Sequence, residues 1–346
     1  MKKKILGLFM ASTMLLGVTH GANAGTISEE LKDVNLELGN ELSLDKNIAT
    51  KQVIDFANQS KSEIAKLKKE KKTFNLKNKE ENVLYSYTLV DDEFIYSFET
   101  SEHSDAQNIK VFKNEYSEKK EADSIQPLAA ANLPDGYGGR LKINSNGTSF
   151  TSSVYTPSSL QTDGLGTPYI YAGFSGKYET DLGLQYNTNR GANQNEVAWA
   201  PYMRISNGDT GTFYPGYNGV QFKNGFAPGV NVSTIIYANN NGKIRLKQQG
   251  YAICGDLNCS NTTDTYMVSI VDSKNTYNLG SSNINSWKVL GVLAGSETGK
   301  VKYTTDFNDI KIDNQVVQSS QFNTPDEEKA TVTRTGNNVK IQVNGY

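Results

Sequence analysis

From Gly139 to the C-terminus, the sequence consists of short runs in which apolar and polar residues alternate. Successive side chains of a β-strand point to opposite faces of a sheet, so this period of two predicts strands with one buried face. Turn sequences rich in Asn and Gly separate several runs, at 239–242, 313–314 and 336–338. About thirteen such runs occur with no helical pattern between them. The pattern predicts a mainly β fold over residues 140–346, an antiparallel sandwich of jelly-roll type.

The first 24 residues have the pattern of a secretory signal peptide. Three lysines precede an apolar run from Ile5 to Val18, and Ala22-Asn23-Ala24 forms a cleavage site of small residues. The apolar run is shorter than the ~20 residues that a bilayer-spanning helix needs. We therefore expect residues 1–24 to be removed. The mature protein is expected to be secreted, extracellular or associated with the cell wall, with no membrane span.

Charge density divides the remaining chain into two parts. Charged residues are more than twice as frequent between Gly25 and Gln126 as between Pro127 and Tyr346. In the charged part, apolar residues return every three or four positions from Thr50 to Lys72, which predicts a helix, and the runs Val83–Val90 and Glu93–Glu99 alternate like paired strands. We expect residues 25–121 to form a charged α+β module, which could be an accessory domain, a pro-region or a spacer. A linker at 122–139 would join it to the sandwich.

Composition excludes several classes of function. The mature chain has a small net negative charge, so no nucleic-acid partner is expected. The two histidines are His20, in the signal peptide, and His103, in the charged module. A Ser-His-Asp or Cys-His catalytic site is therefore not expected in the sandwich. Cys254 and Cys259 are expected to form a local disulfide in an exported chain, with a zinc site disfavoured because no histidine lies nearby.

The most site-like stretch is GFSGKYETDLGLQY, residues 173–186. As a strand, it places Glu179, Asp181 and Gln185 on one face and apolar residues on the other. Carboxylates at this spacing are close enough to separate their pKa values, as acid–base chemistry requires. We assign no catalytic residue, but Glu179 and Asp181 are the candidates. The same polar face would also suit ligand binding or simple contact with water.

The next polar strand, EVAWAPYMRIS, presents Tyr202 and Arg204 on one face. If this face is shared with the two carboxylates, aromatic stacking and paired hydrogen bonds would provide a platform for a sugar. In the alternative interpretation, Trp199 is a core residue and Arg204 neutralises a carboxylate.

The following loop, residues 206–222, carries further aromatic side chains among glycines. These side chains are candidates for saccharide contacts, or they cap one end of the core. The expected ligand-binding residues are therefore Glu179, Asp181, Gln185, Tyr202, Arg204, Tyr214 and Tyr217.

Two charged stretches remain. TDFNDIKIDN contains Asp306, Asn308, Asp309 and Asp313, whose oxygens are the kind of ligand that calcium prefers, although the spacing of a complete calcium loop is missing. We expect no cofactor, with calcium as the alternative.

Basic residues alternate with Ile and Leu in the stretch GKIRLKQQG. This pattern predicts a sheet edge kept soluble by charge, or a dock for an anionic wall polymer.

The stretch GKYETDLGLQY, followed by EVAWAPYMRIS, resembles two neighbouring strands of a concanavalin A-like jelly roll, the architecture of legume lectins, laminin G modules and laminarinase-type glycoside hydrolases. Those hydrolases carry an E-x-D-x-E or E-x-D-x-x-E strand whose outer glutamates act as nucleophile and acid/base. Glu179 and Asp181 match the first two positions, but Gly183 or Leu184 stands in the third, so the acid is missing. The C-terminal two-thirds of the chain also resembles the YrpD-like secreted proteins of bacilli, a resemblance that implies no activity.

The sequence as a whole favours an exported, non-catalytic carbohydrate-binding protein. Its expected partner is a cell-wall or extracellular polysaccharide. One alternative is a carboxylate-dependent glycan-cleaving enzyme. Another is a structural or matrix protein that binds other proteins through sheet edges.

Overall fold

The computed structural model describes residues 31–346, except for 41, 75, 78–81, 103, 115–135, 191–195, 208–211, 219–222 and 254–264. Within the described residues the fold is mainly β, with one α-helix. The predicted signal peptide at 1–24, most of the predicted linker, and both Cys254 and Cys259 lie outside the described residues. The disulfide therefore stays a prediction.

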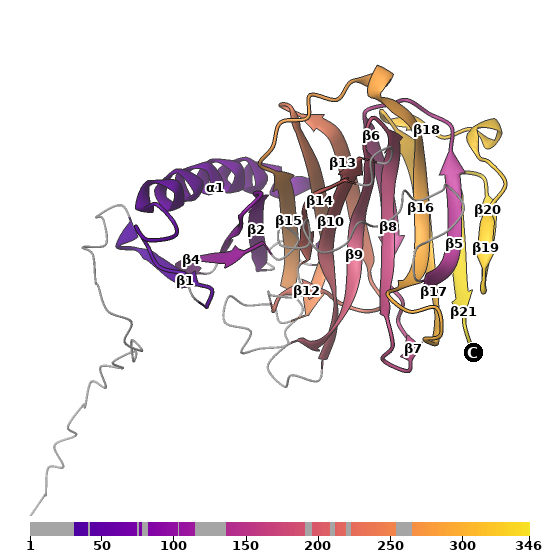
Figure 1. The fold of residues 1–346 in the computed structure, drawn as a ribbon, viewed down its shortest axis with the longest axis horizontal. Coiled ribbons are helices and arrows are strands. Elements are labelled where there is room, and N and C mark those ends of the chain that lie inside the picture. The colour runs from indigo at the N-terminus through magenta and orange to yellow at the C-terminus, as the bar shows by residue number, and fades with distance from the viewer. Residues whose placement is uncertain are drawn as a thin grey trace, which may run out of the picture.

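The elements follow one another along the chain as shown in Figure 1. They are β1 (Val34–Leu38), α1 (Thr50–Glu70), β2 (Val83–Val90), β3 (Phe94–Ser101), β4 (Ser104–Lys113), β5 (Gly136–Ile143), β6 (Ser149–Tyr155), β7 (Gln161–Thr162), β8 (Thr167–Gly176), β9 (Glu179–Arg190), β10 (Glu196–Asn207), β11 (Thr212–Asn218), β12 (Gly225–Phe226), β13 (Asn231–Asn240), β14 (Lys243–Ile253), β15 (Thr265–Ser273), β16 (Ile284–Ala294), β17 (Val301–Ile312), β18 (Gln315–Val316), β19 (Asp326–Glu328), β20 (Ala330–Thr335) and β21 (Asn338–Asn344).

The strands form two layers that pack face to face. In the first layer the order is β20–β21–β17–β6–β13–β14–β15–β2–β3–β4–β1. In the second layer the order is β19–β5–β16–β8–β9–β10, with β11 and β12 on the free side of β10. Strand β12 also pairs with β14, which joins the layers into one mixed sheet. The mainly β prediction is confirmed, whereas the jelly-roll type stays a prediction.

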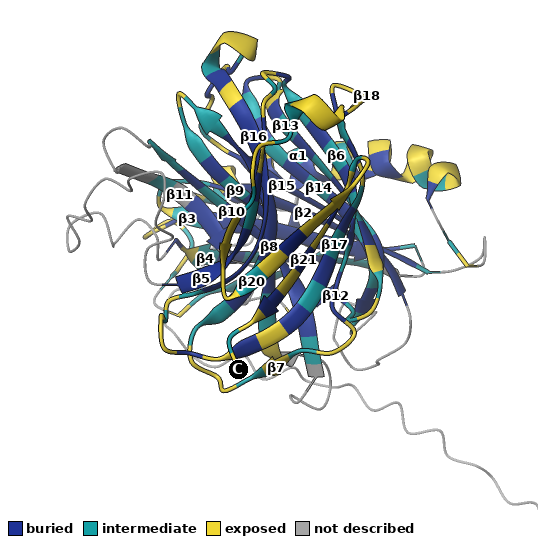
Figure 2. Cartoon of the chain, turned by 90° about the vertical axis from the view of Figure 1, so that its right-hand side faces the viewer, coloured by how far each residue is buried: buried dark blue, intermediate teal, exposed yellow. Residues whose placement is uncertain are grey.

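Large aromatic side chains from both layers fill the space between them. The ring of Trp287, on β16, stacks on Phe150 of β6 in the opposite layer, with ring centroids 5.6 Å apart. Trp199, on β10, is 0% exposed and packs near Tyr303 of β17. The interpretation of Trp199 as a core residue is therefore confirmed. In Figure 2, buried residues alternate with intermediate or exposed ones along β17 and β21, as expected for strands with one face on a core.

The predicted helix is also present, as α1. Its buried stripe consists of the residues that the three- and four-residue spacing indicates: Val53, Phe56, Ala57, Ser60, Ile64 and Leu67. The carboxylate of Asp45 accepts hydrogen bonds from the backbone N–H and the hydroxyl of Thr50, which satisfies a donor at the start of the helix. The stripe packs on a second apolar cluster that includes residues of β2 and β15.

The charged module continues the first layer. Strand β2 runs parallel to β15, with eight residue pairs in register from Val83 and Tyr266 to Val90 and Ser273. Leu84 of β2 lies in the main core between the layers. Figure 1 shows this N-terminal part, which we call the N-terminal module (residues 31–114), at one end of the strand array, with α1 lying over it.

The prediction of an edge strand at GKIRLKQQG is wrong. The strand is β14, and it lies inside the layer between β13 and β15. Strand β14 therefore has no free edge, and its basic side chains bind the N-terminal module. Arg245 forms ion pairs with Asp272 and with Glu63 of α1, and Lys247 contacts a second glutamate of that helix at 2.5 Å. A charge pattern alone does not distinguish a solvated edge from a face covered by an acidic helix.

Candidate functional site

The outer face of the second layer brings together five of the residues predicted to bind a ligand. Asp181 of β9 lies opposite Arg204 of β10, and Gly183 lies opposite Tyr202. Residues opposite each other in antiparallel strands place their side chains on the same face. Glu179 and Gln185 lie on this face as well, because they are two residues on either side of the Asp181–Gly183 pair. We call this group the β9–β10 face.

A buried lysine pairs with both carboxylates on the β9–β10 face. Lys288, on β16, forms ion pairs with Glu179 and with the Oδ1 atom of Asp181, the latter at 2.7 Å. Its side chain is only 9% exposed. Burial by itself would lower the pKa of Lys288, but the adjacent Asp181 and Glu179 outweigh it, so the pKa of Lys288 is raised. Sequence reasoning missed this residue, although a single lysine within the apolar run SWKVLGV was a signal.

The aromatic residues on the β9–β10 face contact one another. The ring of Tyr202 lies 4.8 Å from that of Tyr169 and 6.4 Å from that of Tyr171, between ring centroids. Tyr202 and Gln185 are each 6% exposed. Burial, together with the nearby Asp181 carboxylate, raises the pKa of Tyr171. The rings converge over Gly183, where a Cβ atom would lie 2.4 Å from a backbone carbonyl oxygen of β8.

The two remaining predicted residues lie elsewhere. Tyr217, on β11, is 3% exposed and belongs to the core between the layers, so its ring has no free face for a ligand. Tyr214 is half-buried and makes edge contacts with the rings of Tyr178 and Tyr277, at 5.3 and 5.9 Å between centroids. Tyr217 therefore lies in the core and Tyr214 packs against it, whereas the other five residues lie on the β9–β10 face.

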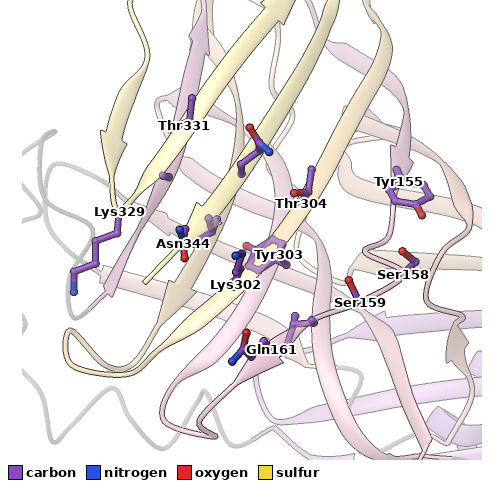
Figure 3. A pocket seen from close by; sticks show the side chains of 14 residues that line it. Tyr155, Ser158, Ser159, Gln161, Lys302, Tyr303, Thr304, Lys329, Thr331 and Asn344 are labelled. Atoms are coloured by element: carbon purple, nitrogen blue, oxygen red, sulfur yellow. The ribbon is translucent and has the colours of Figure 1, made fainter. Parts of the chain in front are cut away.

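An open groove lies on the outer face of the other layer. It has a cavity volume of about 780 Å³ and is bounded by β17, β20, β21 and the segment after β6, as Figure 3 shows. Its lining consists of Tyr155, Ser158, Ser159, Leu160, Gln161, Lys302, Tyr303, Thr304, Lys329, Ala330, Thr331, Gln342, Val343 and Asn344. We call this the β17–β21 groove. Hydroxyl and amide groups predominate in its lining, and none of the lining residues is acidic.

The polar side chains of the groove form rows across neighbouring strands. Gln161 of β7 and Asn344 of β21 both lie opposite Lys302 of β17. In the next row, Gln342 of β21 lies opposite both Thr304 and Thr331. Cross-strand neighbours of this kind are about 5 Å apart at Cβ, so each row presents closely spaced polar groups.

These polar groups are available to a ligand. Among the described residues, no side-chain hydrogen bond is made by Gln161, Thr304, Thr331, Gln342 or Asn344. Amides and hydroxyls both donate and accept hydrogen bonds. Sequence reasoning missed them because Ser, Thr, Asn and Gln at alternate strand positions are also the ordinary residues of a solvated sheet face. No residue type marks such a groove until the strand order is known.

The acidic stretch considered for calcium is used within the fold. The Asp313 carboxylate accepts hydrogen bonds from the backbone N–H groups of Thr148 and Ser149, both at 2.9 Å. Asp309 pairs with Lys311 at 2.5 Å. Within the ranges that the structure describes, no three His, Cys, Asp or Glu side chains are grouped so that they could hold a metal ion. In the same part of the chain, no helix is long and apolar enough to cross a membrane.

Comparison with known proteins gives a family and no activity. A model of the family described as "Domain of unknown function, YrpD" matches residues 130–343. The "Uncharacterized protein YrpD" of Bacillus subtilis (strain 168) is 36% identical over 222 residues, which cover 62% of this chain and 84% of that protein. Crystal structures of scytalido-glutamic peptidase, with a peptide-based transition state analog, and of SCP-B, from the Eqolisin family of peptidases, are 10% identical. Both match 61% of this chain and 100% of their own, with a TM-score of 0.37, which is too low to support a conclusion.

Proposed function

The chain belongs to the YrpD family, and from the geometry of the β17–β21 groove we propose that it is a non-catalytic carbohydrate-binding protein. Its partner in this proposal is a polysaccharide of the cell wall or the extracellular space. The export expected from residues 1–24 and the disulfide expected between Cys254 and Cys259 belong to the same proposal.

The groove carries the proposal because five of its hydroxyl and amide side chains make no hydrogen bond in the part of the chain that is described: Gln161, Thr304, Thr331, Gln342 and Asn344. A sugar ring presents hydroxyl groups that each need a donor and an acceptor, and the amides of Gln342 and Asn344 supply both. Strand pairing fixes the backbone of these residues, so a ligand needs to order only their side chains. Tyr155, at the margin of the groove in Figure 3, is half-exposed and offers a ring for stacking against a sugar.

The β9–β10 face supports binding and cleavage less well. Tyr202 and Gln185 are too buried to meet a sugar without a rearrangement. A glycosidase needs one carboxyl group that acts as an acid and a second, ionised carboxylate. Here Lys288 forms ion pairs with both Glu179 and Asp181, so both carboxylates are already bound within the fold. The alternative of a carboxylate-dependent glycan-cleaving enzyme is therefore less favoured.

Binding of the full chain to a panel of soluble polysaccharides, measured by affinity electrophoresis and then by calorimetry, tests the proposal. In Gln342→Ala and Asn344→Ala we expect at least about tenfold weaker binding, because each variant loses an amide at the floor of the groove. Gln315→Ala is the matched control. This residue is an exposed glutamine of β18, which pairs with the opposite end of β17, and we expect its removal to leave binding unchanged.

Three other outcomes would contradict the proposed binding site or the proposed function. Equal loss of binding in Gln315→Ala would mean that the groove variants act through the fold rather than through contact. Binding that survives in both groove variants but disappears in Arg204→Ala would move the site to the β9–β10 face. Absence of binding to every polysaccharide tested would remove the proposed function.

A further inference from the structure

The β17–β21 groove has a positive charge that no described residue neutralises. Its lining contains two lysines, Lys302 and Lys329, and no carboxylate. The ammonium of Lys329 is already used, because it donates a hydrogen bond to the carbonyl oxygen of Glu297 at 3.1 Å and lies 4.4 Å from the centre of the Tyr137 ring. Lys302 makes no ion pair with any described residue, and its side chain is exposed at the floor of the groove.

In the described part of the chain, no carboxylate forms an ion pair with Lys302. Asp163, two residues after the cross-strand neighbour Gln161, accepts hydrogen bonds from the backbone N–H groups of Leu165 and Lys300. On the same face of β17, the next acidic residue along the strand is Asp306, four positions away and therefore about 13 Å along the strand. Asp306 lies opposite Lys340 of β21, and the two side chains are paired at 3.8 Å. Among the residues that the structure describes, Lys302 is therefore the groove lysine without an ion-pair or hydrogen-bond partner.

Two amide side chains flank Lys302 in the same row. Gln161 lies opposite it on one side and Asn344 on the other, both in register. An ammonium group has three donors, and the amide of each neighbour can turn its N–H₂ group toward a ligand, so the row can offer several donors around one positive charge. Such an arrangement suits an oxyanion, since hydrogen bonds to a charged oxygen are roughly twice as strong as those between neutral groups.

We propose that the β17–β21 groove selects acidic polysaccharides, whose oxyanion groups, a uronate carboxylate or a phosphodiester, bind to Lys302 between Gln161 and Asn344. This inference rests on the proposed function, since it assigns the chemical class of the polysaccharide that the groove takes. The neutral rows of Thr304, Gln342 and Thr331 then contact the hydroxyl groups of the same chain.

Matched polymers test the charge requirement with the full chain. The probes are polygalacturonate, the same polymer with its carboxyl groups methyl-esterified, and poly(glycerol phosphate). We expect polygalacturonate to bind at least about tenfold more tightly than its ester at low salt, and this difference to shrink as ionic strength rises. Lys302→Gln should reduce the affinity to that for the ester, while Lys302→Arg should keep the preference. Lys46→Gln, at an exposed lysine of the N-terminal module, is the control and should bind like the unaltered chain.

The outcomes separate the inference from the proposed function. If the ester and the acid bind equally and Lys302→Gln has no effect, groove binding stands but the acidic preference is overturned. If no polymer binds, both fail. Binding of poly(glycerol phosphate) that is lost in Lys302→Gln supports the same site with phosphate as the preferred oxyanion, and preference for polygalacturonate supports the carboxylate. If Lys302→Gln loses binding and its melting temperature also changes, Lys302→Arg distinguishes a folding defect from a lost charge. If Lys302→Arg folds normally but no longer prefers the acidic polymer, the inference is overturned.

Discussion

At the scale of single residues, Lys288 decides what the β9–β10 face can do. An ion pair removed from water persists only when both charges are present, because a buried charge without its partner is costly. Lys288 meets this condition by binding both Glu179 and Asp181. The polar face of β9 was predictable from the alternation of its sequence. The lysine that pairs with its two carboxylates comes from a strand more than 100 residues later, and the sequence carries no sign that the two strands share a sheet face.

Replacing Lys288 with Met tests this role. We expect Lys288→Met to lower the free energy of unfolding by about 3 kcal/mol, since Asp181 and Glu179 both lose the buried ammonium with which they pair. Adding Glu179→Gln and Asp181→Asn to Lys288→Met should recover most of the loss, because the charges that lacked a partner are gone. Denaturant titration of the single and triple variants measures both effects. A triple variant no more stable than Lys288→Met would mean that the lysine acts through packing rather than charge.

At the scale of elements, α1 was predicted correctly from the local sequence, but the strand residues that bind it were not. The buried stripe of the helix followed from spacing alone, and the structure confirms it. The residues that bind its polar face could not be predicted from the spacing. Arg245 binds Asp272 of β15 and Glu63 of α1, and the Tyr87 hydroxyl lies 3.1 Å from Asp272, so helix and sheet are joined by a network of charges. Basic residues that alternate along a strand predict only that one face is polar.

This network should make the attachment of α1 sensitive to acid. Burial raises the pKa of Glu63, but its hydrogen bond to Lys66 and the charge of Arg245 outweigh burial, so the pKa lies below its ordinary value of 4.5. A carboxyl group with a lowered native pKa contributes stability in full above its ordinary pKa, and this contribution is lost as the pH falls through the native value.

We therefore expect Glu63→Gln to lower the melting temperature by a few degrees at pH 7 and by less at pH 3, because the stability that the carboxylate contributes is lost as the pH falls toward its lowered native pKa. Thermal unfolding followed by the helical circular dichroism signal measures the difference. Asp55→Asn, which removes an exposed carboxylate of the same helix paired with Lys51, is the control and should have a small effect at both pH values. An equal effect of Glu63→Gln at pH 7 and pH 3 would contradict the assignment.

At the scale of the whole molecule, strand pairing crosses the boundary that composition suggests. The change in charge density near Gln126 separates the N-terminal module from the rest of the sequence, and the YrpD family match begins only at residue 130. Yet β2 of the module pairs with β15 over its whole length, and Leu84, Val90 and Ile95 lie in the main core. Composition reflects which residues meet water. It does not report backbone hydrogen bonds between segments that are distant in sequence.

A chain that begins at Gly136 should therefore be prone to association. Without the module, β15 becomes an edge strand with unpaired backbone groups, and its outward side chains Tyr266, Val268 and Ile270 lose the helix that covers them. We expect oligomers or aggregates in light scattering at concentrations where the chain with its module is monodisperse. Val268→Lys in the shortened chain should reduce association, since charges on an edge oppose pairing. A shortened chain that is monodisperse and equally stable would show that the module is dispensable for the sandwich.

The order of strands in the first layer also gives the molecule two distinct ends. Helix α1 covers the outer face at β14, β15 and β2, whereas the β17–β21 groove lies on the outer face at the other end, with β6 and β13 between them (Figures 1 and 3). A molecule immobilised on a support through its N-terminal module would therefore turn the groove away from that support. Attachment through Tyr346, which follows the last strand of the groove, would crowd the groove instead. The orientation in which this protein is displayed thus determines whether its polar rows can meet a polymer in solution.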